Sequence, residues 1–265
     1  MEFGMPTLLE LEDLASNVKL AQDLGLSFVE INCNLPQFQV AQLNADELLA
    51  ITQKTGIAFT FHLDEYMSIT DPDLKISEAY INSVLETIDF AKRAQIDSLT
   101  LHLIKGVIFT LPHKKVYVYE KYKDYYLVRL LEFRDRVTQA IADSLVRVNI
   151  ENVGGFEPYM REGIELLLQS PCFGLTYDCG HNHRYDHLDW DFIQKHAKCI
   201  NHMHVHDCKG QSDHQSFGDG DLDLPSEINF VSRSAKRIVI EVKTEPSLTA
   251  SVATLRLYQK HALLK

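Results

Sequence analysis

The sequence has no apolar run that approaches the roughly 18–20 residues needed to cross a membrane. Residues 1–17 lack the basic region and the small-residue cleavage site of a secretory signal. Five cysteines are scattered along the chain without a CxxC pair, a pattern typical of reduced thiols. We therefore expect a cytoplasmic protein without disulfides and without a membrane partner.

The sequence also lacks a glycine-rich phosphate-binding fingerprint after its first predicted strand, so we expect no nucleotide cofactor. Basic residues are in the minority, and the formal net charge is −11. That charge makes a long polyanion such as DNA a poorer partner than a small molecule. No linker, low-complexity tract or charge block divides the chain, which predicts one domain over residues 1–265.

Strand-like and helix-like segments alternate along all 265 residues, of which 45% are hydrophobic. Near-continuous apolar strands joined by amphipathic helices predict a parallel sheet covered by helices. Eight such units in about 250 residues match the size of a (β/α)₈ TIM barrel, in the α/β class. A doubly wound open sheet is the alternative, and the missing fingerprint weakens it. The predicted strands are 1–6, 27–32, 57–62, 98–103, 146–152, 173–180, 200–208 and 237–243.

The connection after the fourth predicted strand, residues 104–126, is long, aromatic and locally basic. Such connections are commonly lids or binding loops. Its lysines, together with two lysines near strand ends, are candidates for holding a phosphate group, although solvated surface lysines are an equally good interpretation. These candidates are Lys105, Lys114, Lys115, Lys209 and Lys243.

Polar residues interrupt the apolar strands of the predicted barrel at their carboxyl ends, where barrels of this kind place their chemistry. One buried histidine is usually a hydrogen-bonded core residue, but the closure of a barrel makes several strand ends converge. Mixed imidazole and carboxylate groups at one point suit Zn²⁺, Mn²⁺ or Co²⁺. The residues that predict this metal site are His62, His102, Glu151, Asp178, His181, His204, His206 and Glu241.

Four short motifs that contain residues of this predicted metal site resemble those of the xylose isomerase-like TIM-barrel superfamily. They are NIEN at 149–152, YDCGH at 177–181, HVHD at 204–207 and IEVK at 240–243. The superfamily holds sugar and sugar-phosphate isomerases and epimerases together with endonuclease IV. The resemblance covers essentially the whole chain in order and spacing.

This resemblance implies a divalent metal (Mn²⁺, Zn²⁺, Co²⁺ or Mg²⁺) held by Glu151, Asp178, His204 and Glu241. In the isomerase and epimerase branch, the carboxylates that match Glu151 and Glu241 also move protons. His202, His204 and His206 alternate along one strand, so their side chains point the same way. We expect His202 to be structural, and His206 to lie with Asp207 at the rim.

Further histidines match the nuclease branch. His62 and His102 match its additional metal ligands, and His181 matches a residue that touches substrate in one branch and binds metal in the other. His214 precedes a G-x-G turn, as a ligand of the nuclease branch does, but Ser212 stands where that pattern has an aspartate. This departure puts a complete third metal site in doubt.

The sequence thus favours a metal-dependent isomerase or epimerase acting on a sugar or sugar phosphate. Glu151 and Glu241 would serve as acid and base through an enediolate. An endonuclease IV-like phosphoester hydrolase with several zinc ions is the alternative, and the histidine-rich inventory favours it. A metal-bound sugar-binding protein is a third reading. The expected partner is a small carbohydrate or phosphorylated molecule, and a homo-oligomer remains open.

Overall fold

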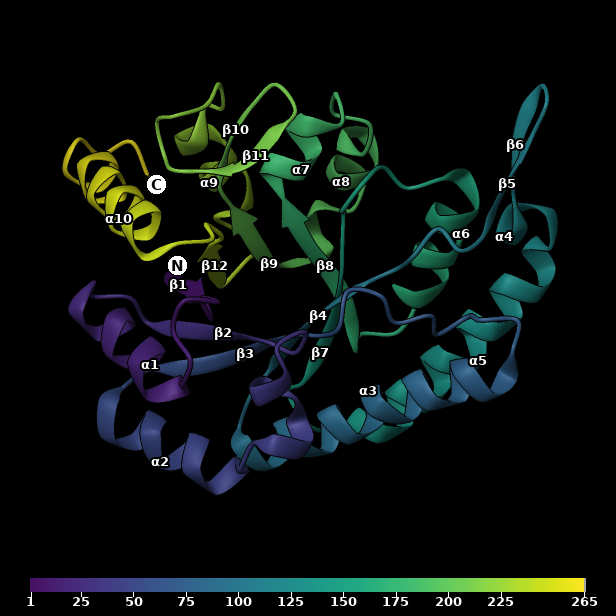
Figure 1. Ribbon diagram of the computed structural model, residues 1–265, viewed down its shortest axis with the longest axis horizontal. Helices are drawn as coiled ribbons and strands as arrows, with labels where there is room; N and C mark the ends of the chain where they lie inside the picture. The colour runs from purple at the N-terminus through teal and green to yellow at the C-terminus, as the bar shows by residue number, and fades with distance from the viewer. Residues whose placement is uncertain (265) are drawn as a thin grey trace.

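The computed structural model describes residues 1–264. Within them, parallel strands close into a barrel in the order β1-β12-β9-β8-β7-β4-β3-β2, which confirms the predicted TIM barrel (Figure 1). The barrel strands are β1 (Glu2–Pro6), β2 (Phe28–Asn32), β3 (Ala58–His62), β4 (Ser98–His102), β7 (Arg147–Glu151), β8 (Phe173–Asp178), β9 (Ile200–Val205) and β12 (Arg237–Ile240).

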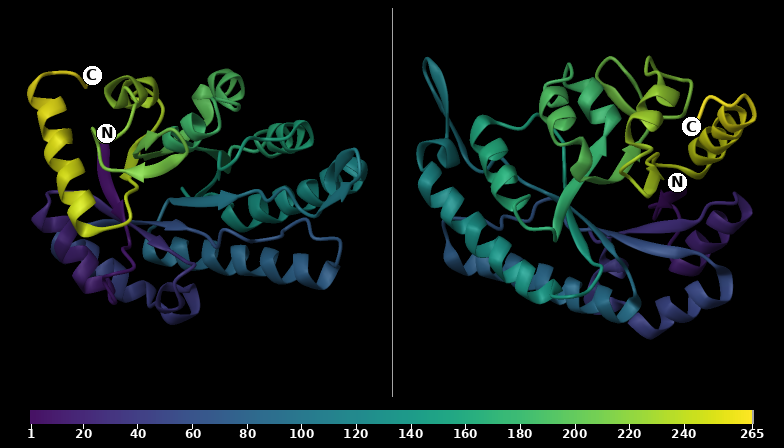
Figure 2. Two further views of the ribbon diagram at one scale, coloured as in Figure 1. Left: turned by 45° about the horizontal axis from the view of Figure 1, so that its top comes forward. Right: turned by 180° about the vertical axis from the view of Figure 1, so that it is seen from behind.

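Helices surround the barrel on its outside (Figure 2). The helices that follow successive barrel strands are α1 (Leu14–Asp23), α2 (Ala45–Thr55), α3 (Leu74–Ala94), α5 (Lys123–Ile141), α6 (Pro158–Leu167), α8 (Trp190–Lys195), α9 (Leu224–Val231) and α10 (Glu245–Lys260). Local sequence sets their ends: Asn44 caps α2, and Gly56 ends it at a φ of 77°. Among residues 1–264, no helix combines the length and apolar character needed to cross a bilayer.

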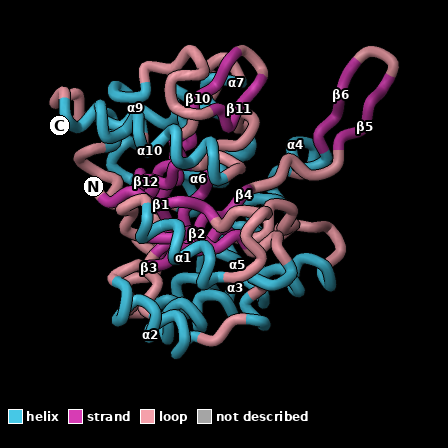
Figure 3. The backbone as a smooth tube through the Cα atoms, turned by 60° about the vertical axis from the view of Figure 1, so that its left-hand side comes forward, coloured by secondary structure: helices cyan, strands magenta, loops and turns pink. Residues whose placement is uncertain are grey.

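The connection between β4 and α5 contains regular secondary structure. It contains an antiparallel hairpin, β5 (Ile108–Leu111) and β6 (Lys114–Tyr117), followed by the short helix α4 (Val118–Lys121). The hairpin projects away from the barrel (Figure 3). Short 3-10 turns complete the described elements at Pro36–Phe38, Val40–Gln42 and Ala197–Cys199.

The predicted strand 200–208 is too long, because β9 ends at Val205. Residues beyond it form a second small hairpin, β10 (Asp207–Lys209) and β11 (Ser212–Gln215). The chain turns there because the Asp207 carboxylate accepts hydrogen bonds from the backbone N–H groups of Cys208, Gly218 and Leu222. These contacts fold the following segment back over the end of the barrel.

The register of the barrel sets polar side chains at one level. His102 is the Cα partner of Glu151 between β4 and β7, and Asp178 is the partner of His204 between β8 and β9. Neighbouring positions in a parallel sheet place their side chains side by side. The carboxyl ends of β4, β7, β8 and β9 therefore present imidazole and carboxylate groups side by side.

Candidate metal centre

Four side chains from four consecutive strands of the barrel meet at its carboxyl end. Glu151 ends β7, Asp178 ends β8, His204 lies in β9 and Glu241 directly follows β12. One ligand atom from each lies within 4.8 Å of the others, and all four residues are buried. The structure thus brings together the four residues that the resemblance implies as metal ligands.

His204 lies at the centre of this group. Its Nδ1 atom is 3.1 Å from Glu151 Oε1 and 3.3 Å from Glu241 Oε2. Asp178 caps the short helix α7 (Cys179–Arg184), accepting the backbone N–H of His181 at Oδ1 over 2.6 Å. Its second oxygen, Oδ2, remains turned toward His206 and the ring of His181.

Two carboxylates of this group, Glu151 and Glu241, are ionised in spite of their burial. Burial disfavours the charged form of Glu151, but the positive charges of His204 and His102 outweigh it and hold its pKa well below the usual range. Lys243 and His204 lower the pKa of Glu241 in the same way against burial. The carboxylates in turn raise the pKa of His204 well above its ordinary value, although burial opposes its charge.

These residues fit a divalent cation. The Oε2 atom of Glu241 and the Nδ1 atom of His181 are buried without hydrogen-bond partners, which is costly unless another group satisfies them. A mixed set of carboxylates and one imidazole is the donor set expected for Mn²⁺, Co²⁺ or Zn²⁺. A cation at this point would supply the missing partner for Glu241.

Two further predicted residues pack against Glu151. The Nε2 atoms of His102 and His62 lie 3.0 and 3.3 Å from Glu151 Oε2. The Nδ1 atom of His62 donates to the carbonyl of Leu63 over 2.8 Å. Burial disfavours the charged form of His62, but the contact with Glu151 outweighs it and raises its pKa to about 9. His62 therefore faces Glu151 as a protonated imidazole in the absence of a metal.

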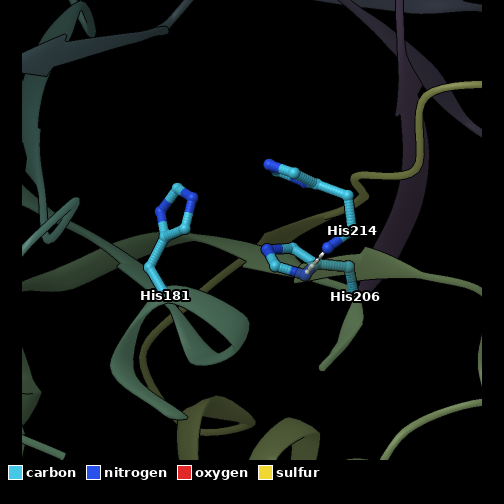
Figure 4. A group of neighbouring side chains, drawn as sticks. All are labelled: His181, His206 and His214. Atoms are coloured by element: carbon cyan, nitrogen blue, oxygen red, sulfur yellow. Dashed lines mark hydrogen bonds between the residues drawn. The ribbon is translucent and has the colours of Figure 1, made fainter. Parts of the chain in front are cut away.

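The other predicted histidines form a second group beside the first. Figure 4 shows His181, His206 and His214 with their rings turned toward one another. The backbone N–H of His214 donates to His206 Nδ1 over 2.8 Å. Because that nitrogen accepts, the Nε2 atom of His206 carries a proton, and it lies 3.1 Å from Asp178 Oδ2. His206 thus holds the free oxygen of Asp178 in place.

The structure corrects one expectation about the rim. His206 and Asp207 are both buried rather than open at the rim. The His206 ring packs against His214, with 4.2 Å between the ring centroids, and the Asp207 carboxylate holds backbone N–H groups. Lys209 is exposed on β10. Lys243 pairs with Glu241 Oε1 at 2.8 Å. Asp213 pairs with Arg184, and its Oδ2 atom also lies 3.7 Å from His181 Nε2.

Sequence reasoning missed Glu30 and the role of Asn152. Glu30 lies inside β2 with 1% of its surface exposed and contacts His202 and His204. Asn152 exchanges two hydrogen bonds with the backbone of Asp178 and ties the ends of β7 and β8 together. A charge inside an apolar strand was the available signal for Glu30, since its burial is costly without a partner.

A cleft of about 540 Å³ opens beside Glu151 and His102 and runs under the β4–α5 connection. Tyr119 from α4 and Phe156 from the loop after β7 contribute to its walls. Lys105 also lines the cleft, where its ammonium group bonds Glu157 and the carbonyl of Gly154. Lys114 and Lys115 lie exposed on the projecting hairpin and do not line this cleft.

The family model of the xylose isomerase-like TIM barrel matches residues 18–261. The chain belongs to the xylose isomerase-like TIM barrel family. This membership confirms the resemblance that the four strand-end motifs carry. Among curated proteins, no sequence matches the chain.

Several solved structures share this fold over nearly the whole chain. A D-tagatose 3-epimerase-like protein is 17% identical with a TM-score of 0.80, and each chain is covered to 98%. The D-psicose 3-epimerase of Clostridium cellulolyticum, solved with D-tagatose, is 15% identical with a TM-score of 0.75 and full coverage of both chains. The IolI protein, solved with a zinc atom, is 16% identical with a TM-score of 0.73, covering 99% of this chain and 98% of its own.

The packing of His206 gives a test of this geometry. A Cβ atom at Gly180 would overlap the buried His206 ring, so Gly180→Ala must displace the ring from Asp178. We expect a loss of about 1–3 kcal/mol of stability, measured by urea unfolding. Gly154→Ala is the control, since its Cβ would meet Tyr185 only at ordinary contact distance, and it should change stability by under about 0.5 kcal/mol. Equal stability of the two variants would contradict the described packing.

Proposed function

We propose that the protein is a divalent-metal-dependent isomerase or epimerase of a sugar or sugar phosphate. The observation that carries this proposal is the convergence of Glu151, Asp178, His204 and Glu241 around one point. A bound divalent ion supplies a Lewis acid for the carbonyl and the neighbouring hydroxyl oxygen of the substrate. The fold shared with sugar epimerases supports the reaction class.

Glu151 and Glu241 are the acid and base of the proposed reaction. Both are ionised, as their lowered pKa values indicate, and each carboxylate has two oxygens, so one can bind the cation while the other exchanges a proton. One glutamate takes the proton from the carbon next to the carbonyl, giving an enediolate. Because both glutamates start ionised, the second must first take up a proton from solvent, which it then gives to the opposite face of the enediolate to complete an epimerisation, while the first releases its proton to solvent. His102 holds Glu151 in place during the transfer through its Nε2 atom, 3.0 Å from Oε2.

The charge of the cleft favours a neutral sugar over a sugar phosphate. Among the described residues that line it, Lys105 is the only lysine or arginine, and it already pairs with Glu157. The same lining contains the carboxylates of Glu65, Asp71 and Glu151. A phosphate dianion there would meet more negative than positive side chains. Unphosphorylated ketoses are therefore the first substrates to test.

A phosphoester hydrolase is the second candidate, and the state of His62 favours it. Since His62 donates its Nδ1 proton to Leu63, its Nε2 lone pair would be available to a second cation once the ring is deprotonated. His62, Glu151 and His204 offer ligand atoms within 4.8 Å of one another. A second ion there would suit the activation of water in a multi-metal hydrolase.

Exchange of solvent deuterium tests the proposed reaction. We expect the metal-loaded protein to incorporate deuterium next to the carbonyl of a ketose such as D-tagatose or D-fructose, detected by NMR. Glu151→Gln and Glu241→Gln should each lower the exchange rate by about 100-fold or more, because an amide cannot accept the proton. Glu227 is a carboxylate outside the site that accepts a hydrogen bond from the Tyr177 hydroxyl. Glu227→Gln should therefore retain the wild-type exchange rate.

Full exchange in either site variant would refute the proposed roles of the two glutamates. The absence of exchange with every ketose, together with zinc-dependent cleavage of bis(4-nitrophenyl) phosphate, would favour the hydrolase instead.

Metal binding should depend on pH. In the metal-free protein the raised pKa of His204 keeps its ring protonated at neutral pH, and an imidazole must lose that extra proton before it can bind a metal. The ion therefore displaces a proton, so the affinity for Co²⁺ should rise between about pH 6 and pH 8, by up to about tenfold per unit for each proton released. Calorimetry in buffers of different ionisation enthalpy counts the protons. A pH-independent affinity would contradict binding through His204.

A further inference from the structure

Glu30 is a buried carboxylate that contacts His204 of the candidate metal centre. It lies in the middle of β2 with 1% of its surface exposed. Its contacts are with His202 Nε2 at 2.9 Å, His204 Nε2 at 2.8 Å and Thr60 Oγ1 at 3.2 Å. Among residues 1–264, no lysine or arginine forms an ion pair with it. Keeping an ionised carboxylate so deep in the barrel costs several kcal/mol unless paired charges and hydrogen bonds offset its desolvation.

The two nitrogens of His204 face opposite groups. Nε2 faces Glu30, whereas Nδ1 faces Glu151 and Glu241. A cation held among Glu151, Asp178 and Glu241 can reach only Nδ1, which must then present a lone pair. The ring proton then belongs on Nε2, which is buried without a hydrogen-bond partner of good geometry. Glu30 Oε1, 2.8 Å away, is the acceptor within its reach.

The remaining contacts of Glu30 fix its own orientation. Its second oxygen, Oε2, accepts hydrogen bonds from His202 and Thr60. This leaves Oε1 directed at His204. His202, fully buried, reaches Glu30 from β9, and its Nδ1 atom has no hydrogen-bond partner. The contacts thus form a chain from His202 through Glu30 to His204.

We propose that Glu30 is a positioning residue of the metal centre: it accepts the Nε2 proton of His204 and thereby holds the Nδ1 lone pair toward the ion. This inference rests on the proposed function, because it requires an ion at His204. It also explains why a carboxylate occupies a position that an apolar residue would fill at lower cost. Glu30, His202 and His204 also lie close enough to bind an ion themselves, but His204 would then have to serve two ions with its two nitrogens.

Binding of Co²⁺ to the metal-free protein tests this role. Glu30→Ala should raise the dissociation constant by about 10- to 100-fold, as the loss of a carboxylate behind a histidine ligand does elsewhere. Glu30→Gln should raise it less, because its amide oxygen can still accept the Nε2 proton. Both variants should shift the visible absorption of bound Co²⁺, since the ligand ring is less well fixed, while the number of ions per chain stays at the wild-type value.

A matched control separates this effect from a general loss of stability. Thr100→Val removes a buried hydrogen bond to Thr176 inside the barrel without touching His204. It should lower the unfolding temperature of the metal-free protein while leaving the Co²⁺ affinity and spectrum unchanged. Glu30→Gln preserves the shape of the side chain and carries the test if the alanine variant does not fold.

Wild-type affinity and spectrum in the Glu30 variants would overturn this inference and leave the proposed function intact. The loss of one ion per chain in these variants would also overturn it, because Glu30 would then be a ligand itself. A wild-type protein that binds no Co²⁺ would instead refute the metal site of the proposed function, and the role of Glu30 with it.

Discussion

Inside the barrel, buried carboxylates are paired with imidazoles, and the geometry of the candidate metal centre depends on that pairing. Glu30 is held by His202 and His204, Glu151 by His204, and Asp178 by His206. An unpaired carboxylate at this depth would cost several kcal/mol. His202 and His204 in β9, and His206 just past its end, thus pair with carboxylates from the interior of the barrel to the ends of its strands.

The sequence allowed the barrel to be predicted because its signals are local. Apolar runs and helical stripes repeat along the chain, and a parallel sheet covered by helices is what they can form. The end of β9 could not be predicted, because Asp207 turns the chain there through the backbone of Gly218 and Leu222. The β5–β6 hairpin was missed for a related reason: its residues read as an aromatic and basic loop, and its strands pair only with each other.

The convergence of the site followed from topology, since the carboxyl ends of barrel strands meet at one face. This reasoning found Glu151, Asp178 and His204, but it examined strand ends and so missed Glu30 in the middle of β2. The sequence could not predict which ring nitrogen of each histidine carries the proton. For His206 it depends on the backbone N–H of His214 in a separate hairpin, which no sequence pattern reveals.

The most direct test of this account is the metal content of the protein, purified without chelator or histidine tag and measured by plasma mass spectrometry. The isomerase or epimerase account predicts about one divalent ion per chain, bound by Glu151, Asp178, His204 and Glu241. Two or three zinc ions per chain would contradict it, because His62, His102, His181 and His214 would then be ligands of a multi-metal hydrolase. A chain that holds no ion, even after incubation with Mn²⁺, Co²⁺ or Zn²⁺, would contradict the metal centre itself.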